Sequence, residues 1–298
     1  MGSEIALPLR IGARTIGTVR RRLVRHALSL DEALAEAAPS LAPLGPDDHG
    51  YLVTALPESR LAQVAAAHPA LKPFVRQHYR RSYARLDQDF ETYFGGFSAK
   101  SRATCRRKLK RLAERSGGAI DVRAYAEPEE MRDFHALARE VSRKTYQERL
   151  LGAGLPESPE AVAAMLELAA AGRVRGWLLF LEGAPIAYLY APAEGLTLSY
   201  AYLGYDPEFA ALSPGTVLQL EAMRLLMAEQ RFRLFDFTEG DGQHKRLFAS
   251  GGVDCVDLLL VRRRPMNLLA GYTLAGFDGA VALAKRLLGG RLARRLRR

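Results

Sequence analysis

The sequence predicts a mixed α/β (α+β) fold, and residues 196–252 carry the clearest signs of it. Leu196 to Gly204 is aromatic and aliphatic, as in a half-buried strand. Ser213-Pro214-Gly215 then supplies an N-cap oxygen, a first-turn proline and a glycine, which begin a helix and leave backbone N–H groups free for a ligand. Leu234 to Phe237 follows as a second buried strand, so strand and helix alternate here.

Length and composition bound the class of protein. The 298 residues suffice for one large domain or two modest ones with a substantial core. A formal charge of +10 indicates an anionic partner, which can be a nucleotide, coenzyme phosphates, an acidic lipid surface or RNA. Cys105 and Cys255 have neither disulfide nor metal-ligand spacing, so we expect reduced thiols, a cytoplasmic protein and no metal site. Neither a signal peptide nor a membrane span is predicted.

Residues 1–90 form the first predicted section. Its elements are a strand pair over Ile5–Thr18 turned at Gly12, a helix from Ser29 to Ala38, a strand from Tyr51 to Ala55 and a helix from Ser59 to Ala67. Arg76 to Arg85 interleaves arginines with tyrosines, a pattern that binds nucleic acid through stacking and phosphate contacts. Solvated arginines beside a strand explain it as well, and we favour that interpretation.

A strongly basic helix is predicted next, capped by Ser98 and ended by Gly117-Gly118. Two adjacent faces carry its cations, Arg102, Arg106 and Lys110 on one and Arg107, Arg111 and Arg115 on the other. Such a helix can face phosphates or an anionic membrane, or can be a solvated charged helix, and the pattern does not decide between them.

The next predicted elements are a strand over 119–125, helices over 128–143 and 158–171, a hairpin turned at Glu182-Gly183 and a last strand over 253–262. The loop from Leu151 to Gly154 is either a substrate lid or a surface connection. From Pro265 the chain predicts a further helix. Its last residues, 285–298, interleave arginines with leucines, as in an interfacial membrane helix. A helix packed on the domain and a frayed basic tail are the alternatives.

Charged side chains gather after the strand at 234–237. Asp236, Glu239, Asp241, His244 and Lys245 fall within ten residues. Ligands of open α/β sheets commonly bind beyond the carboxyl ends of strands, so this cluster is the candidate reacting centre. The simpler interpretation is that Asp236 is a satisfied buried carboxylate and that residues 239–242 form only a tight turn.

Three motifs in this order carry a family resemblance: YLGYDPEF at 202–209, SPG at 213–215 and FDFTEGDGQHK at 235–245. With the order of predicted elements, they resemble GNAT-type acyltransferases, and more closely the CelD-like and FemAB-like branch, over roughly residues 80–262. The resemblance implies a mostly antiparallel central sheet flanked by helices in a domain over residues 91–264. Residues 1–90 would then be a degenerate GNAT-like half, and 265–298 a basic amphipathic C-terminal helix.

The same resemblance implies an acyl-CoA co-substrate and no permanently bound cofactor. Where the common GNAT pattern has a glycine-rich loop, this chain has Ser213, Pro214, Gly215 and Thr216. A helix N-terminus favours pyrophosphate through its N–H groups and dipole, so these four residues are the predicted cofactor-binding residues. Fem-type relatives use aminoacyl-tRNA instead, so a tRNA donor stays open although nucleic acid is the less favoured partner.

GNAT enzymes let an amine attack a thioester directly, which requires a base, an oxyanion donor and an acid for the leaving thiolate. Glu239 and Asp241 are the predicted bases, with Asp236 orienting its neighbours. His244 or Lys245 would donate to the leaving group or hold phosphate. The predicted substrate-binding residues are Tyr200, Tyr202, Lys144 and Tyr146.

The leading hypothesis is an N-acyltransferase that moves an acyl group from acyl-CoA to an amine. The basic tail favours a lipid (sphingoid-base-like) or envelope precursor as acceptor, as in bacterial ceramide-synthase-like enzymes, and a place at the inner face of the membrane. A Fem-like aminoacyltransferase using aminoacyl-tRNA is the second hypothesis. A non-catalytic RNA- or membrane-binding module is the third.

Overall fold

The structure is a computed structural model that describes residues 2–11, 14–145, 148, 154–240 and 242–295, with the backbone alone for Gln243 and 285–295. The chain forms two compact units, one from residues 1–80 and 253–298 and one from residues 81–252. This grouping differs from the predicted sections 1–90, 91–264 and 265–298. The reason is that β11 (Gly251–Arg262) pairs with β3 (Gly50–Pro57), which joins both ends of the chain in one unit.

The first unit is a sheet in the order β1-β2-β3-β11-β4. Its remaining elements are β1 (Ser3–Ile11), β2 (Arg14–Ala27), α1 (Leu30–Leu34), η1 (Glu58–Arg60), α2 (Leu61–Ala67), β4 (Leu71–Arg85) and α10 (Pro265–Arg295). The predicted strand pair is confirmed as β1 and β2, and its turn at Gly12 lies outside the described residues. The helix predicted from Ser29 to Ala38 is shorter than expected, because Glu36 takes a left-handed backbone with φ 49°.

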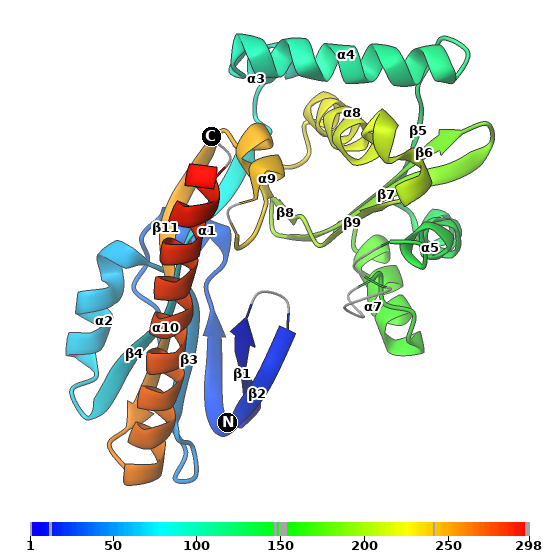
Figure 1. Cartoon of the computed structure of the whole chain (residues 1–298). Helices are drawn as coiled ribbons and strands as arrows, with labels where there is room; N and C mark the ends of the chain where they lie inside the picture. Colours follow the sequence, from blue (N-terminus) through cyan, green and yellow to red (C-terminus); the bar gives the residue numbers. More distant parts are fainter. Residues whose placement is uncertain (1, 12–13, 146–147, 149–153, 241, 296–298) are drawn as a thin grey trace. The chain divides into compact units, whose positions relative to one another are not determined.

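Alternate residues of β11 divide the core of the first unit between the two faces of its sheet. Leu258 and Leu260 pack with residues of α2 and β3, whereas Leu259 and Val261 pack with Leu274 of α10. Helix α10 approaches the sheet closely, since a Cβ at Gly271 would lie 2.3 Å from the Phe74 ring of β4. In Figure 1, α10 (orange to red) accordingly runs along the strands of this unit.

The second unit is a mostly antiparallel sheet in the order β4-β10-β8-β7-β6-β5, with β9 beside β7. Only the end of β4 belongs to it. Its further elements are α3 (Phe90–Gly95), α4 (Ala99–Arg115), β5 (Asp121–Tyr125), α5 (Pro128–Ser142), α7 (Pro159–Ala170), β6 (Val174–Leu181), β7 (Ala184–Glu194), β8 (Thr197–Ser199), β9 (Tyr202–Tyr205), η2 (Pro207–Leu212), α8 (Pro214–Glu229), β10 (Leu234–Asp236) and α9 (Gln243–Phe248).

Both faces of this second sheet are covered by helices. Trp177 and Leu179 of β6 pack toward α3, α4 and α8, whereas Leu178 and Phe180 pack toward α5 and α7. Complete burial on both faces explains why β6 reads as an unbroken apolar run. The predicted fold class, a mixed α/β fold with a mostly antiparallel sheet flanked by helices, is confirmed.

The stretch from Leu196 to Gly204 is two strands, so the prediction of a single strand is wrong. The strand β8 ends at Ser199, and β9 begins at Tyr202. Their partners differ: β8 pairs with β7 and, in parallel, with β10, whereas β9 pairs with β7. Within the described residues no ladder joins β9 to β10. The sheet therefore opens at Tyr200 and Ala201, next to the end of β10.

Two of the predicted helix starts differ in how they are capped. The Ser98 side chain accepts from the N–H of Ser101, as expected. Ser213 is also an N-cap residue, but its backbone is left-handed (φ 57°, ψ 47°) and its side chain makes no capping bond, so the predicted N-cap oxygen is wrong. The start of α8 is set by Pro214 at its first helical position.

Helix α10 departs from the predicted basic amphipathic pattern in its first half. Apolar side chains lie on both of its faces there: Leu274 is fully buried, whereas Met266 and Leu269 are exposed. The side chains of 285–298, on which the basic pattern rests, lie outside the described ones. No helix in the described ranges has an apolar stretch long enough to cross a bilayer.

Candidate active site

The N-terminus of α8 lies against β9, beside the opening in the second sheet. Pro214 and Gly215 are buried. A Cβ at Gly215 would lie 3.0 Å from Leu203, so glycine permits the helix end to approach the strand. The N–H groups of Thr216 and Val217 both donate to the Ser213 carbonyl. The helix therefore offers a ligand fewer free N–H donors than predicted. The helix dipole then contributes more than these N–H groups to attracting an anion.

Lys108 of α4 reaches this same helix end. Its Nζ donates to Thr216 Oγ1 across 3.1 Å, and Arg111 Nη1, one turn later, donates to the Ala211 carbonyl across 3.1 Å. A cation at the positive end of a helix dipole is unfavourable unless an anion joins it. The arrangement thus concentrates positive charge where the sequence predicted the donor phosphates to bind.

Sequence reasoning missed Lys108, although a signal was available. It belongs to neither of the two cationic faces of the helix. It stands three residues after Cys105 and four before Leu112, both of which are buried, so helical spacing puts it toward the core. A half-buried lysine beside an apolar stripe, on a helix full of solvated cations, is the feature that would have distinguished it.

Asp236 at the end of β10 is buried and fully paired. Its Oδ2 accepts from Nε and Nη2 of Arg81, at 3.0 and 2.6 Å, and its Oδ1 accepts from the N–H of Thr238 at 2.7 Å. The side chain is 1% exposed. Both of its oxygens are engaged by Arg81 and by the backbone of the following turn. A carboxylate so occupied is not available to accept a substrate proton.

Lys245 lies over this turn. Its Nζ donates to Thr238 Oγ1 (3.4 Å) and to the backbone carbonyl of Glu239, and it lies 5.9 Å from the centre of the Tyr200 ring. Burial lowers the pKa of Lys245, while the carboxylates of Asp236 and Glu239 oppose that shift. Glu239 itself is exposed. Asp241, the other predicted base, lies outside the described residues.

His244 packs between aromatic rings, 6.1 Å from Tyr200 and 4.8 Å from Phe248, measured between ring centres. Its Nε2 is buried and has no hydrogen-bond partner in the described part of the chain. Burial, followed by the charges of Lys108 and Lys245, lowers the pKa of His244 to about 4. The imidazole is therefore neutral at pH 7 and cannot hold a phosphate as a cation.

The two predicted tyrosines contact different parts of the core. Tyr200 packs against Phe235 and Phe237 on the α8 side, and burial raises its pKa. Tyr202 packs against Tyr190 (6.2 Å between ring centres) on the α5 side. In one continuous strand, residues two apart would share a face. The break after β8 separates them, and Tyr200 alone joins the cluster with His244 and Lys245.

Lys144, another predicted substrate residue, follows α5 on the face of the sheet opposite α8. Lys144 Nζ pairs with Asp206 Oδ2 at 2.8 Å, and Asp206 Oδ1 also accepts from the N–H of Glu208. Lys144 therefore ties the end of α5 to η2. Tyr146 lies outside the described residues, as does most of the predicted lid, residues 151–153.

A buried polar network near this lid has no counterpart in the predictions. Arg139 of α5 forms a bidentate pair with Glu148 (2.8 and 2.7 Å), and Ser142 Oγ donates to the same carboxylate. The Tyr188 hydroxyl of β7 donates in turn to Ser142 Oγ at 3.2 Å. Arg139, Ser142 and Glu148 lie within ten residues of one another, whereas Tyr188 joins them from β7, 46 residues after Ser142.

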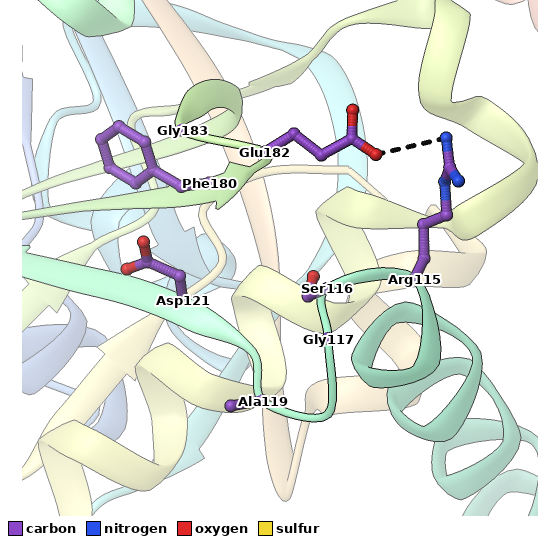
Figure 2. Close-up of a pocket in the computed structure, with 8 residues that line it drawn as sticks. All are labelled: Arg115, Ser116, Gly117, Ala119, Asp121, Phe180, Glu182 and Gly183. Atoms are coloured by element: carbon purple, nitrogen blue, oxygen red, sulfur yellow. Dashed lines mark ion pairs between the residues drawn. The ribbon is translucent and has the colours of Figure 1, made fainter.

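A surface pocket of about 340 Å³ lies elsewhere in the second unit (Figure 2). It is lined by the end of α4, the start of β5 and the β6–β7 turn, and Arg115 pairs with Glu182 across it at 3.3 Å. None of the predicted site residues lines this pocket. The cluster around Tyr200, rather than this pocket, is the candidate active site.

The chain matches one family model. Residues 99–246 match the family model described as acetyltransferase (GNAT) domain. This range includes Lys108, Tyr200, Thr216, His244 and Lys245. A search of curated protein sequences found no match to the chain.

Solved structures with a similar fold include FemX, at 11% sequence identity and a TM-score of 0.59 over 91% of this chain and 90% of that one. Another is the C-terminal domain of a putative lysylphosphatidylglycerol synthetase from Agrobacterium fabrum (14% identity, TM-score 0.51, 79% and 73%). A third is a conserved protein of unknown function from Bacteroides thetaiotaomicron (12% identity, TM-score 0.50, 72% and 70%). At these identities the likeness is one of fold.

Proposed function

We propose that this protein is an N-acyltransferase that transfers an acyl group from acyl-CoA to an amine. The supporting observation is the convergence at the opening of the sheet: the N-terminus of α8 with Lys108 on one side, and Tyr200, His244 and Lys245 on the other. The charge of Lys108 contributes to the lowered pKa of His244, so the two sides lie within electrostatic reach of each other.

The donor would bind at the α8 side. Lys108 Nζ and the helix dipole supply positive charge for phosphate groups, and residues 213–216 form the wall of that site. Thr216 Oγ1 can turn its hydrogen to a phosphate oxygen while it still accepts from Lys108. The opening between β9 and β10 would then receive the thioester arm.

The chemistry would occur near Tyr200. The amine nitrogen attacks the thioester carbon, the new N–C bond forms, and the C–S bond breaks after the tetrahedral intermediate collapses. The acceptor ammonium first loses one proton to the base, because only the free amine attacks; its nitrogen loses a second proton as the amide forms, and the departing thiolate gains one, so one proton is released overall. Tyr200, which burial keeps protonated, is the proposed acid, Lys245 supplies positive charge to the developing oxyanion, and Glu239 is the proposed base, directly or through water.

The proposed acceptor is a lipid-like amine of the sphingoid type or an envelope precursor, which would put the chain with the CelD-like members of the GNAT superfamily. The basic sequence of residues 285–298 supports an acceptor that resides at an anionic surface.

A second candidate is transfer from aminoacyl-tRNA. The observation that favours it is the FemX fold, which matches both units of this chain and not only its GNAT part. In that reaction the amine attacks an ester, and a ribose hydroxyl leaves in place of a thiolate.

An amine-dependent thiol-release assay tests the proposal. The full chain is incubated with acyl-CoAs of two to eighteen carbons and a panel of amines that includes a sphingoid base, while CoA release and the amide product are followed. Thiol release that requires the amine supports acyl-CoA as donor. No release with any pair, together with transfer of a radiolabelled aminoacyl group from tRNA, would replace the proposal by the second candidate.

A further inference from the structure

The net positive charge of the protein comes from one of its two units. Residues 81–252 contain 23 Lys and Arg and 23 Asp and Glu, so the unit with the candidate active site is neutral overall. Residues 1–80 and 253–298 contain 20 Lys and Arg against 10 Asp and Glu. The whole excess of +10 therefore lies outside the GNAT unit, and binding of the acyl donor does not explain it.

An exposed apolar surface lies on the same unit. Met266, Leu269 and Tyr272 of α10 are 65%, 60% and 59% exposed, and their three-residue spacing puts them on neighbouring positions of one helix face. Leu283, further along, is 58% exposed. These four residues define what we call the outer face of α10.

The outer face carries no charge of its own. Between Pro265 and Ala284 the only charged residue is Asp278, whose Oδ2 accepts from Arg76 Nε at 2.6 Å on β4. The opposite side of α10 packs on the sheet, where Leu274 is fully buried and Gly271 meets the Phe74 ring. Tyr272 touches the edge of that ring (5.0 Å between ring centres) yet stays 59% exposed, whereas Met266 and Leu269 are 65% and 60% exposed. An uncharged apolar face on a helix already anchored by its other side is unusual on a soluble surface.

In the sequence, cations flank this face on both sides. Arg263 and Arg264, exposed, precede the helix, and residues 285–298 contain seven Lys and Arg and no acidic residue. Binding to a groove on a protein partner, or to a second copy of the neutral unit, would not require cations clustered beside an apolar face. Binding to an anionic bilayer requires both, because apolar side chains enter the acyl boundary while flanking cations contact lipid headgroups.

We propose that the outer face of α10 docks in the plane of an anionic lipid surface, held by Met266, Leu269 and Tyr272 and by the cations on either side. The docking is independent of acyl transfer, so it can be measured without any substrate, and its failure leaves the proposed reaction untouched.

Sedimentation of the full chain with vesicles tests this surface. Vesicles of phosphatidylcholine alone are compared with vesicles containing one third phosphatidylglycerol, at 0.1 M and 0.5 M salt. We expect binding to the anionic vesicles only, weakened but not abolished at the higher salt. The variant Met266→Ser/Leu269→Ser/Tyr272→Ser should lose about tenfold or more in partitioning, because it removes three side chains that would be buried in lipid.

The matched control is Leu225→Ser, which alters an exposed apolar residue of the neutral unit and should bind like the parent. Thermal unfolding confirms that each variant is folded. Equal binding by the triple variant, or no binding to anionic vesicles, overturns the proposal. Competition by RNA with no dependence on the three apolar residues would make the surface a nucleic-acid site. A dimer in light scattering that dissociates in the triple variant would make it a contact between copies.

Discussion

Lys108 Nζ lies 3.1 Å from Thr216 Oγ1 and so brings a cation from α4 to the first turn of α8. The proposed donor half and the proposed reacting half of the candidate site meet through this lysine. Its charge lowers the pKa of His244 on the reacting side while it stands at the proposed phosphate site.

Replacing Lys108 by alanine should raise the KM for acyl-CoA by about ten- to a hundredfold with a smaller change in kcat, because a hydrogen bond from a charged group is worth about 1.5–3 kcal/mol. Steady-state kinetics at a fixed amine concentration measures the changes in KM and kcat separately. Lys110→Ala on the same helix is the control, since Lys110 is exposed and pairs only loosely with Glu114 (3.8 Å). Equal effects of both substitutions would mean that Lys108 acts only through the net charge of the helix.

The pH dependence of stability should reveal His244. Its folded pKa is about 4, whereas an unfolded histidine titrates near 6.5. Between these values the unfolded chain binds a proton that the folded chain does not. The contribution is therefore fully present above about pH 6.5 and is lost as the pH falls toward 4. Urea unfolding measures the free energy of unfolding at pH 7 and at pH 4.5. Between these two pH values that free energy should fall less for His244→Gln than for the parent protein.

A direct titration separates this effect from other acid-sensitive groups. The imidazole resonances of His244 should move with a midpoint near pH 4, and Lys108→Met should shift that midpoint upward, because one of the two neighbouring positive charges is removed. A midpoint near 6.5 in the parent protein would show that the ring is exposed to solvent, contrary to the structure.

Substituting Asp236 by asparagine should lower the free energy of unfolding by about 3–5 kcal/mol, because it breaks a buried charged pair with Arg81. Chemical denaturation is the measurement. Asp87→Asn is the matched control: its pair with Arg85 is exposed on both sides and should be worth less than about 1 kcal/mol. The double variant Asp236→Asn/Arg81→Met should recover part of the loss.

Gly204→Ala should destabilise the second unit by about 1–3 kcal/mol, the range expected for an overpacked core. A Cβ at this position of β9 would lie 2.4 Å from the Tyr188 ring and 2.8 Å from the Thr145 methyl group. Gly95→Ala is the control, since nothing lies within 4 Å of its added Cβ. If both variants unfold at the same denaturant concentration, Tyr188 can move aside at little cost.

Local chemistry made much of the fold predictable. Ser98 and Ser158 mark helix starts through capping bonds within three residues, and Glu182-Gly183 marks the hairpin through its left-handed backbone. Because both faces of β6 are buried, its sequence is an unbroken apolar run that is recognisable as a strand. In each case the interactions that decide the structure lie within a few residues of one another, so the sequence pattern alone contains them.

The candidate site was less predictable, because distant partners decide it. Arg81 reads as one arginine in a charged run, yet it pairs with Asp236, 155 residues away. The interruption at Tyr200 depends on which strands lie beside β8 and β9, and the composition of 196–204 does not reveal that. The left-handed Ser213 likewise follows from how η2 meets α8. The roles of Asp241 and Tyr146 stay predictions.

The place of β11 between β3 and β4 has a consequence for synthesis on the ribosome. The first 80 residues emerge without an interior strand of their own sheet, because the partner of β3 is translated about 200 residues later. Residues 81–252 are continuous and can complete their core first. We therefore expect nascent chains released before residue 262 to hold a folded middle and an unpaired β3 edge, a template for aggregation.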